Sequence, residues 1–173
     1  MNLIKLKNIY MKKFFAILFM LVAVVGLWSC NDDNTENDAL YTMQLPGTWM
    51  LESGNEQEPV VRQYIFNSDG EFTYGFSSMN IKEATMKTWS VRGAWNVKKG
   101  KLQLYYDLGT LRTSGYNESE IKQMKSELNA HNDDLVEMNK KGRVYGATIA
   151  FMTVEGKSML QLSGFNGYFE KMN

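Results

Sequence analysis

The sequence is poor in the residues that mark several common protein classes. Its 173 residues include one Cys, one His and two Pro. A single Cys excludes a disulfide-stapled scaffold, and 44% hydrophobic residues with so little Pro exclude collagen-like and disordered chains. Only one long apolar run occurs, near the N-terminus, which excludes a membrane protein with several helical spans.

Basic residues are also scarce once the first 30 residues are set aside. The chain has 19 basic and 19 acidic residues, but four of the basic ones precede Cys30, where no acidic residue occurs: Lys5, Lys7, Lys12 and Lys13. The remaining 15 basic residues stand against 19 acidic ones. Because an acidic chain repels phosphate backbones, nucleic acid is not expected as a partner.

The N-terminal segment has the pattern of a secretory signal. Lys12 and Lys13 precede an apolar run over residues 14–27, which is shorter than the roughly 20 residues of a membrane span. The run ends in Leu27-Trp28-Ser29-Cys30, which resembles the lipobox of bacterial lipoproteins. The resemblance implies that residues 1–29 are a signal peptide and that Cys30 is acylated, for example with palmitate. The alternative is an uncleaved anchor with an incidental Cys.

Residues 30–44 are expected to be the lipidated Cys and a polar, acidic tether. Acidic residues directly after the Cys resemble the surface-export signal of Bacteroidota lipoproteins. We therefore expect the chain to be lipid-anchored to the outer membrane of the cell envelope. Whether it faces outward or toward the periplasm stays open, as does the start of translation at Met1 or Met11.

From residue 45 onward, hydrophobic residues alternate with polar ones between turn signals, which is typical of β-strands. The pattern predicts eight strands, at residues 47–53, 60–66, 72–76, 86–97, 101–107, 144–154, 158–163 and 168–171. Asp69-Gly70 predicts a tight hairpin between the second and the third.

Between the fifth and sixth predicted strands the period changes to that of a helix, with five apolar residues on one face: Ile121, Met124, Leu128, Leu135 and Met138. Asn117 and Glu120 form a capping-box pattern, and Lys140-Lys141-Gly142 predicts the end of the helix. The polar residues 132–134 leave open a break into two shorter helices.

This pattern predicts an all-β domain over residues 45–173. We expect an eight-stranded, antiparallel, up-and-down β-barrel with a helical insert between strands five and six, because closing the sheet removes exposed edges. The interior of such a barrel is either filled by side chains or holds one small ligand.

Several short motifs resemble lipocalins and the small lipocalin-like (calycin) lipoproteins of Bacteroidota. They are Gly47-Thr48-Trp49, residues 93–97, residues 99–102 and residues 168–171. The resemblance implies that Trp49 packs across the closed end of the barrel under an Arg of a late strand, and Arg143 is the only late Arg. Lipocalins carry a helix after the eighth strand, whereas the insert here follows the fifth.

No pattern points to catalysis, and we expect neither an enzyme nor a cofactor. His131 could act as a general base or metal ligand beside Asp133 and Asp134, but it has no second His as a partner, and no nucleophile elbow or phosphate loop occurs. A helix residue half covered by the barrel explains His131 better. The twelve Met are scattered, which favours core filling over metal capture.

The remaining candidate is a binding cavity lined by aromatic residues predicted to share one face of the sheet: Phe72, Tyr74, Phe76, Trp89, Trp95 and Tyr106. Two functions follow from it. The first is binding of a small apolar or amphipathic ligand, with the helical insert as a lid. The alternative is a filled barrel that acts as a structural or protein-interaction module of the cell envelope.

Overall fold

The computed structural model describes residues 35–172. The described residues belong to one compact unit. The predicted signal peptide, Cys30 and the first part of the predicted tether lie outside the described residues.

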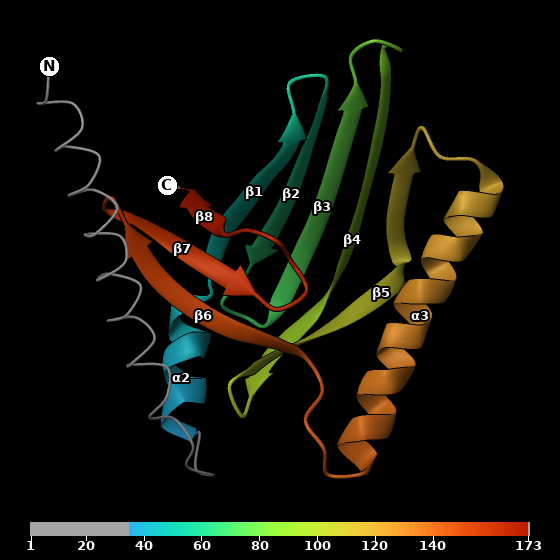
Figure 1. Cartoon of the computed structure of the whole chain (residues 1–173). Coiled ribbons are helices and arrows are strands. Elements are labelled where there is room, and N and C mark those ends of the chain that lie inside the picture. Colours follow the sequence, from blue (N-terminus) through green and yellow to red (C-terminus); the bar gives the residue numbers. More distant parts are fainter. Residues whose placement is uncertain (1–34, 173) are drawn as a thin grey trace, which may run out of the picture. The chain divides into compact units, whose positions relative to one another are not determined.

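The described residues are mostly β, with eight antiparallel strands in one ring-like sheet (Figure 1). Each strand pairs with the next along the chain, and the last pairs with the first. The strands are β1 Gly47–Asn55, β2 Glu58–Phe66, β3 Glu71–Asn80, β4 Thr85–Lys98, β5 Lys101–Ser114, β6 Ala147–Val154, β7 Lys157–Leu162 and β8 Phe169–Met172. The predicted strand count, the antiparallel pairing and the position of the helix between the fifth and sixth strands are confirmed.

A helix that the sequence did not reveal precedes the ring: α2 spans Thr35–Gln44, in the segment expected to be a tether. The carboxylate of Asp38 accepts hydrogen bonds from the backbone N–H groups of Lys99 (2.7 Å) and Gly100 (2.6 Å). Tyr41 packs its ring 5.7 Å from that of Phe151 on β6. These contacts fix α2 against the turn between β4 and β5 and against β6.

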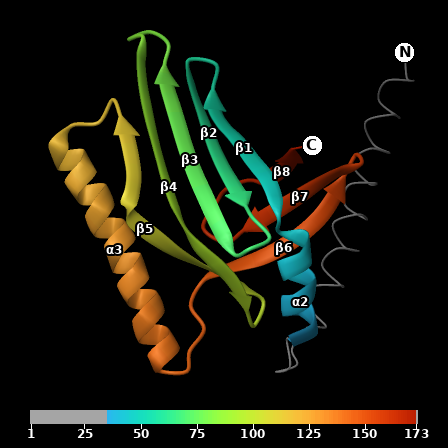
Figure 2. The ribbon, with the colours of Figure 1, turned by 180° about the vertical axis from the view of Figure 1, so that it is seen from behind.

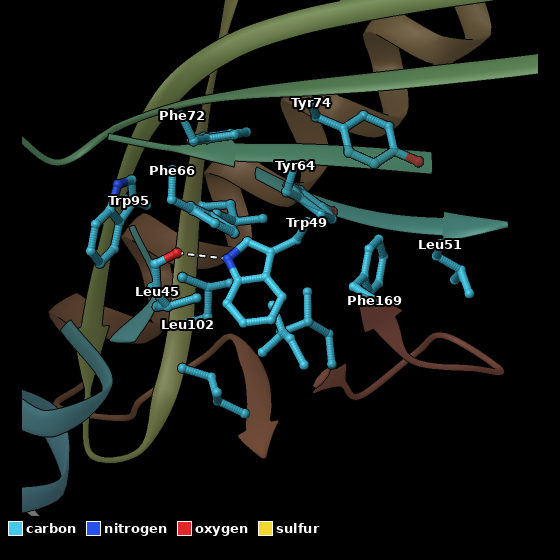
Figure 3. Packing of buried hydrophobic residues seen from close by; sticks show 14 of the residues in the cluster. Leu45, Trp49, Leu51, Tyr64, Phe66, Phe72, Tyr74, Trp95, Leu102 and Phe169 are labelled. Atoms are coloured by element: carbon cyan, nitrogen blue, oxygen red, sulfur yellow. Dashed lines mark hydrogen bonds between the residues drawn. The ribbon is translucent and has the colours of Figure 1, made fainter. Parts of the chain in front are cut away.

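The end of the ring next to α2 is filled by large side chains. Nine residues of the core cluster are less than 2% exposed: Trp49, Phe66, Phe72, Phe169, Leu45, Leu102, Leu160, Leu162 and Val91. Figure 3 shows the indole of Trp49 among them, donating a hydrogen bond of 2.7 Å to the carbonyl of Leu45 just after α2. Phe72 and Trp95, two of the residues expected to line a cavity, belong to this filled core.

The strand pairings around the ring differ in length, and the shortest are β5 with β6 and β7 with β8, with two residue pairs each. The pairs that join β5 to β6 are Lys101 with Thr148 and Leu102 with Ala147. We call this short pairing the seam. Beyond the seam, β5 continues to Ser114 with β4 as its strand partner and no strand on its other side.

A bulge lies farther along β5, after its pairing with β6 has ended at Leu102. Between Asp107 and Arg112, β5 has extra residues opposite Val91 of β4. Thr110 holds this bulge, because its hydroxyl accepts a hydrogen bond from the backbone N–H of Arg92 (2.8 Å) and donates one to the carbonyl of Asp107 (2.7 Å). Bulges of this kind bend a strand, and the bend of β5 is visible in Figure 1. The predicted fifth strand ended at Asp107, where the bulge begins.

Helix α3, Glu118–Lys140, lies alongside β5 in both views (Figures 1 and 2). The predicted capping box is confirmed: the side chain of Asn117 accepts from the N–H of Glu120 (2.9 Å), and the carboxylate of Glu120 accepts from the N–H of Asn117 (2.8 Å). Helix α3 is continuous through residues 132–134, so the break that was left open does not occur. Its buried apolar residue is Leu135.

Gly93 on β4 tests the packing of the ring. A Cβ at this position would lie 1.8 Å from the carbonyl oxygen of Tyr105 and 2.8 Å from the ring of Phe72, whereas a Cβ at Gly75 on β3 would meet no atom within 4 Å. We expect Gly93→Ala to lower the free energy of unfolding by about 3 kcal/mol, because neither the backbone nor the buried ring can yield freely. Urea unfolding of residues 31–173 measures it. Gly75→Ala is the control, with an expected change below about 1 kcal/mol; equal effects would contradict the close packing.

Candidate functional site

Side chains of α3 occupy the edge of β5 that β6 leaves free. The side-chain carbonyl of Asn132 accepts from the backbone N–H of Tyr106 (3.0 Å), and its amide donates to the carbonyl of the same residue (2.8 Å). This is the donor and acceptor pair that a neighbouring strand would otherwise supply. Helix α3 therefore takes the place of a strand partner beyond the seam.

Two neighbours of Asn132 extend this contact along β5. His131 Nε2 lies 3.0 Å from the carbonyl oxygen of Leu104, and since a carbonyl only accepts, Nε2 carries the proton in this contact. Gln103 is buried and donates to the carbonyl of Tyr145 (2.8 Å), in the segment between α3 and β6. These bonds hold α3 and its following loop on the same edge.

A pocket of about 360 Å³ lies beside the seam. We call it the seam pocket. Its lining is mostly apolar and aromatic and comes from β2, β5, β6, β7, α3 and the loops next to them: Tyr64, Leu102, Leu104, Tyr106, His131, Tyr145, Gly146, Ala147, Leu162, Ser163, Gly164 and Phe165. The ring of His131 lies 5.3 Å from that of Tyr106 and 5.5 Å from that of Tyr145. The pocket thus combines aromatic walls with a few polar groups, as ligand sites commonly do.

Burial favours the neutral forms of three side chains that line the seam pocket, Tyr64, Tyr106 and His131. Burial raises the pKa of Tyr64 well above its usual value, and the neighbouring hydroxyls of Tyr106 and Tyr74 raise it further. Burial also raises the pKa of Tyr106 and lowers that of His131, against the opposing effects of the Leu104 carbonyl and Asp134 on the imidazole. A neutral imidazole and protonated phenols offer hydrogen bonds without a fixed charge.

The six residues expected to line a cavity lie along the inner face. Phe72, Tyr74 and Trp95 belong to the buried core, and Tyr106 is the one that lines the seam pocket. Tyr74, Phe76 and Trp89 lie together farther from α2. The rings of Tyr74 and Trp89 are 4.9 Å apart, and those of Phe76 and Trp89 are 6.3 Å apart.

Sequence reasoning missed Tyr64, Tyr145 and Phe165 as pocket residues. Tyr64 could have been found, because it alternates with the buried Phe66 on β2. Tyr145 and Phe165 lie in loops, and nothing in the period of the sequence assigns a loop residue to a pocket. His131 is half-buried against β5, as the core interpretation expected.

A second hollow, of about 450 Å³, lies at the far end of the first four strands. We call it the hairpin groove. It is lined by Gly54, Asn55, Glu58, Val60, Ser78, Met79, Asn80, Glu83, Thr85 and Lys87. Val60 and Ser78 are directly opposite each other on β2 and β3 and lie on the inner face.

Within residues 35–172, no three His, Cys, Asp or Glu side chains come together as metal ligands. Over the same residues, neither helix combines the length and apolar character that a membrane crossing requires. No family model matches the chain, and no curated protein matches its sequence.

Asn132 tests whether α3 replaces a strand at the seam. We expect Asn132→Ala to lower the free energy of unfolding of residues 31–173 by about 2 kcal/mol, because the N–H and carbonyl of Tyr106 both lose their partner. Urea unfolding provides the measurement. Asn129→Ala, one turn earlier, removes a bond of 3.0 Å to Asp133 on the exposed side of the same helix and should change the stability by less than about 0.5 kcal/mol. Equal losses in the two variants would reject the role of Asn132.

Proposed function

We propose that the chain is a lipocalin-like lipoprotein, anchored to the outer membrane through a lipid on Cys30, that binds a small apolar or amphipathic ligand in the interior of its β-barrel. The observation that carries this proposal is the seam pocket, with Tyr106 and Tyr64 on its inner wall and His131 of α3 at its edge. Helix α3 is the lid of the pocket. The ring provides the rigid walls.

The size and chemistry of the seam pocket support a small ligand. Its volume of about 360 Å³ is at the lower end of the range of about 300–1,000 Å³ common for small-molecule sites. Its walls are apolar, and burial favours the neutral forms of Tyr64, Tyr106 and His131, so an apolar body with one or two hydrogen-bonding groups fits better than a highly charged one. On the lid side, α3 donates and accepts side-chain hydrogen bonds to β5, and these can break without unpairing strands.

The position of Trp49 supports the lipocalin-like part of the proposal. It begins β1, is buried at the end of the ring next to α2, and lies under a cation, with Lys171 Nζ of β8 5.1 Å from its ring centroid. The resemblance led us to expect an Arg in this role, but Arg143 is exposed in the loop after α3. A Lys from the last strand occupies the place instead, and it also donates to the carbonyl of Gln44 (3.3 Å).

The alternative is a structural or protein-interaction module of the cell envelope. It is favoured by three apolar side chains exposed around the turn between β3 and β4, where Met79 is 41%, Ile81 49% and Met86 51% exposed. Clustered apolar exposure of this kind is typical of contact surfaces. The two functions predict different outcomes for the experiment on the pocket below.

Cys30 tests the anchor. In a bacterial host that processes lipoproteins, the wild-type chain should incorporate an alkyne-labelled palmitate and fractionate with the outer membrane. Cys30→Ala should lose the label and leave the membrane fraction, because the acylated thiol is gone. Trp28→Ala keeps the thiol and serves as the control, with labelling retained. A labelled Cys30→Ala chain would refute the assignment of the lipid to Cys30.

Ala147 tests the pocket, because it lines the seam pocket from β6, whereas Ala150 is exposed three residues later on the same strand. Residues 31–173 are incubated with an envelope extract, repurified and weighed by native mass spectrometry. We expect a reproducible extra mass that disappears on denaturation. Ala147→Phe should reduce the ligand-bound fraction at least about tenfold, because the new ring occupies the space of the ligand.

Ala150→Phe is the matched control and should keep the extra mass. Cooperative thermal unfolding of all three proteins shows that each is folded. Bare protein from several extracts would reject ligand binding and favour the interaction module. Equal occupancy in Ala147→Phe and the wild type would place any ligand outside the seam pocket.

A further inference from the structure

The inner face of β2 connects the two hollows of the ring. Val60, Arg62 and Tyr64 alternate along this strand and point to the same side. Val60 lines the hairpin groove and Tyr64 lines the seam pocket. Arg62 therefore places a guanidinium group on the inner face between the two hollows.

The surroundings of Arg62 are a hydroxyl and aromatic rings. Its Nη1 donates to the hydroxyl of Ser53 on β1 (3.0 Å), and its guanidinium carbon lies 5.4 Å from the ring centroid of Phe76 on β3. It is also close enough to Tyr74 to lower the pKa of that hydroxyl, although burial outweighs this effect and raises the pKa to about 12. None of these partners is a carboxylate.

Three other cations of the described residues pair with carboxylates. Over residues 35–172, the salt bridges join Lys87 to Glu120, Lys141 to Glu137, and Lys157 to Glu170, and none includes Arg62. Lys87 is the informative comparison, because it lines the hairpin groove and pairs with Glu120 of α3 at 2.6 Å. Among the described residues, Arg62 thus places a positive charge on the inner face without a salt-bridge partner.

The aromatic rings beside Arg62 provide a flat apolar wall. Phe76 lies under the guanidinium, and the ring of Trp89 follows at 6.3 Å with an angle of 32° between the two planes. A planar apolar group can pack against such rings while a guanidinium binds an oxyanion through two parallel N–H groups. A purely apolar ligand would use the rings and leave the charge without a partner.

We propose that Arg62 is an anion-binding residue of the ring interior, and that the ligand is an amphipathic anion whose flat apolar body packs on Phe76 and Trp89 and whose oxyanion binds the guanidinium. This inference rests on the proposed function and specifies the class of its ligand. The oxyanion can be a carboxylate, a phosphate or a sulfonate, because all three accept from the same fork of donors. Ser53 supplies a hydroxyl beside the same group.

Two fluorescent probes separate the charge from the apolar body. The sulfonate 8-anilino-1-naphthalenesulfonate and the neutral N-phenyl-1-naphthylamine share the same rings and differ in the sulfonate. Binding of each to residues 31–173 is measured by fluorescence titration. We expect Arg62→Gln to weaken binding of the sulfonate about tenfold or more and to leave the neutral probe within about twofold, because one charge-assisted contact is lost.

Arg112→Gln is the control for the loss of a positive charge. Arg112 is on β5, is exposed and donates only to the nearby carbonyls of Gly109 and Leu111. Its substitution should leave binding of both probes unchanged. Arg62→Lys keeps the charge without the fork and should give an intermediate loss of sulfonate affinity.

The salt dependence of probe binding to the wild type provides a test that does not require any variant to fold. Raising NaCl from about 20 to about 500 mM should weaken binding of the sulfonate probe and leave binding of the neutral probe unchanged, because salt screens the attraction between the sulfonate and the guanidinium. Equal binding of both probes, unchanged by Arg62→Gln and by salt, would overturn the role of Arg62 and leave the ligand-binding proposal standing. Failure of both probes to bind, together with bare protein in native mass spectrometry, would overturn both proposals.

Discussion

The seam between β5 and β6 is the constraint on which the rest of the structure depends. Two residue pairs leave most of β5 without β6 as a partner, and farther along the strand the bulge held by Thr110 interrupts its pairing with β4. An unpaired strand edge is normally a liability, because its free N–H and carbonyl groups recruit other strands. Here the amide of Asn132 satisfies the edge from a helix. A helix can satisfy the backbone groups of a strand edge with a single side chain. It therefore leaves space in the interior that the inward-facing side chains of a continuous strand would have filled.

This arrangement divides the interior into two parts with different roles. The end next to α2 is packed with Trp49, Phe66 and Phe72, so it contributes apolar burial and hence stability. The part beside the seam retains a pocket because α3 covers it from the outside instead of contributing a row of inward-facing side chains. The interior of the ring is therefore filled around Trp49 and keeps a hollow beside the seam. Ligand binding and a filled core are compatible in one domain for this reason.

The sequence predicted the features that depend on local pattern and could not predict those that depend on contacts across the chain. Alternation located all eight strands, and the capping box at Asn117 located the start of α3. Helix α2 was missed because its residues have no strong apolar stripe, and Asp38 holds it in place through the distant N–H groups of Lys99 and Gly100. Of the candidate site, alternation selected the correct inner face but not the division of that face into core and pocket, since the division follows from the seam. Lipidation of Cys30 rests on a local motif outside the described residues and stays a prediction.

The electrostatics of the inner face then determine what a ligand has to be. Burial keeps Tyr64 and Tyr106 protonated and His131 neutral, so the seam pocket disfavours a buried charge in its ligand. Arg62, one step along β2, has the opposite requirement, because a guanidinium without a carboxylate partner gains most from an anion. A ligand that satisfies both places its apolar or weakly polar part toward Tyr64 and its oxyanion on Arg62. The ring would in this way prefer a ligand that is apolar at one end and anionic at the other. A molecule that is apolar throughout or charged at both ends would lose one of the two contacts.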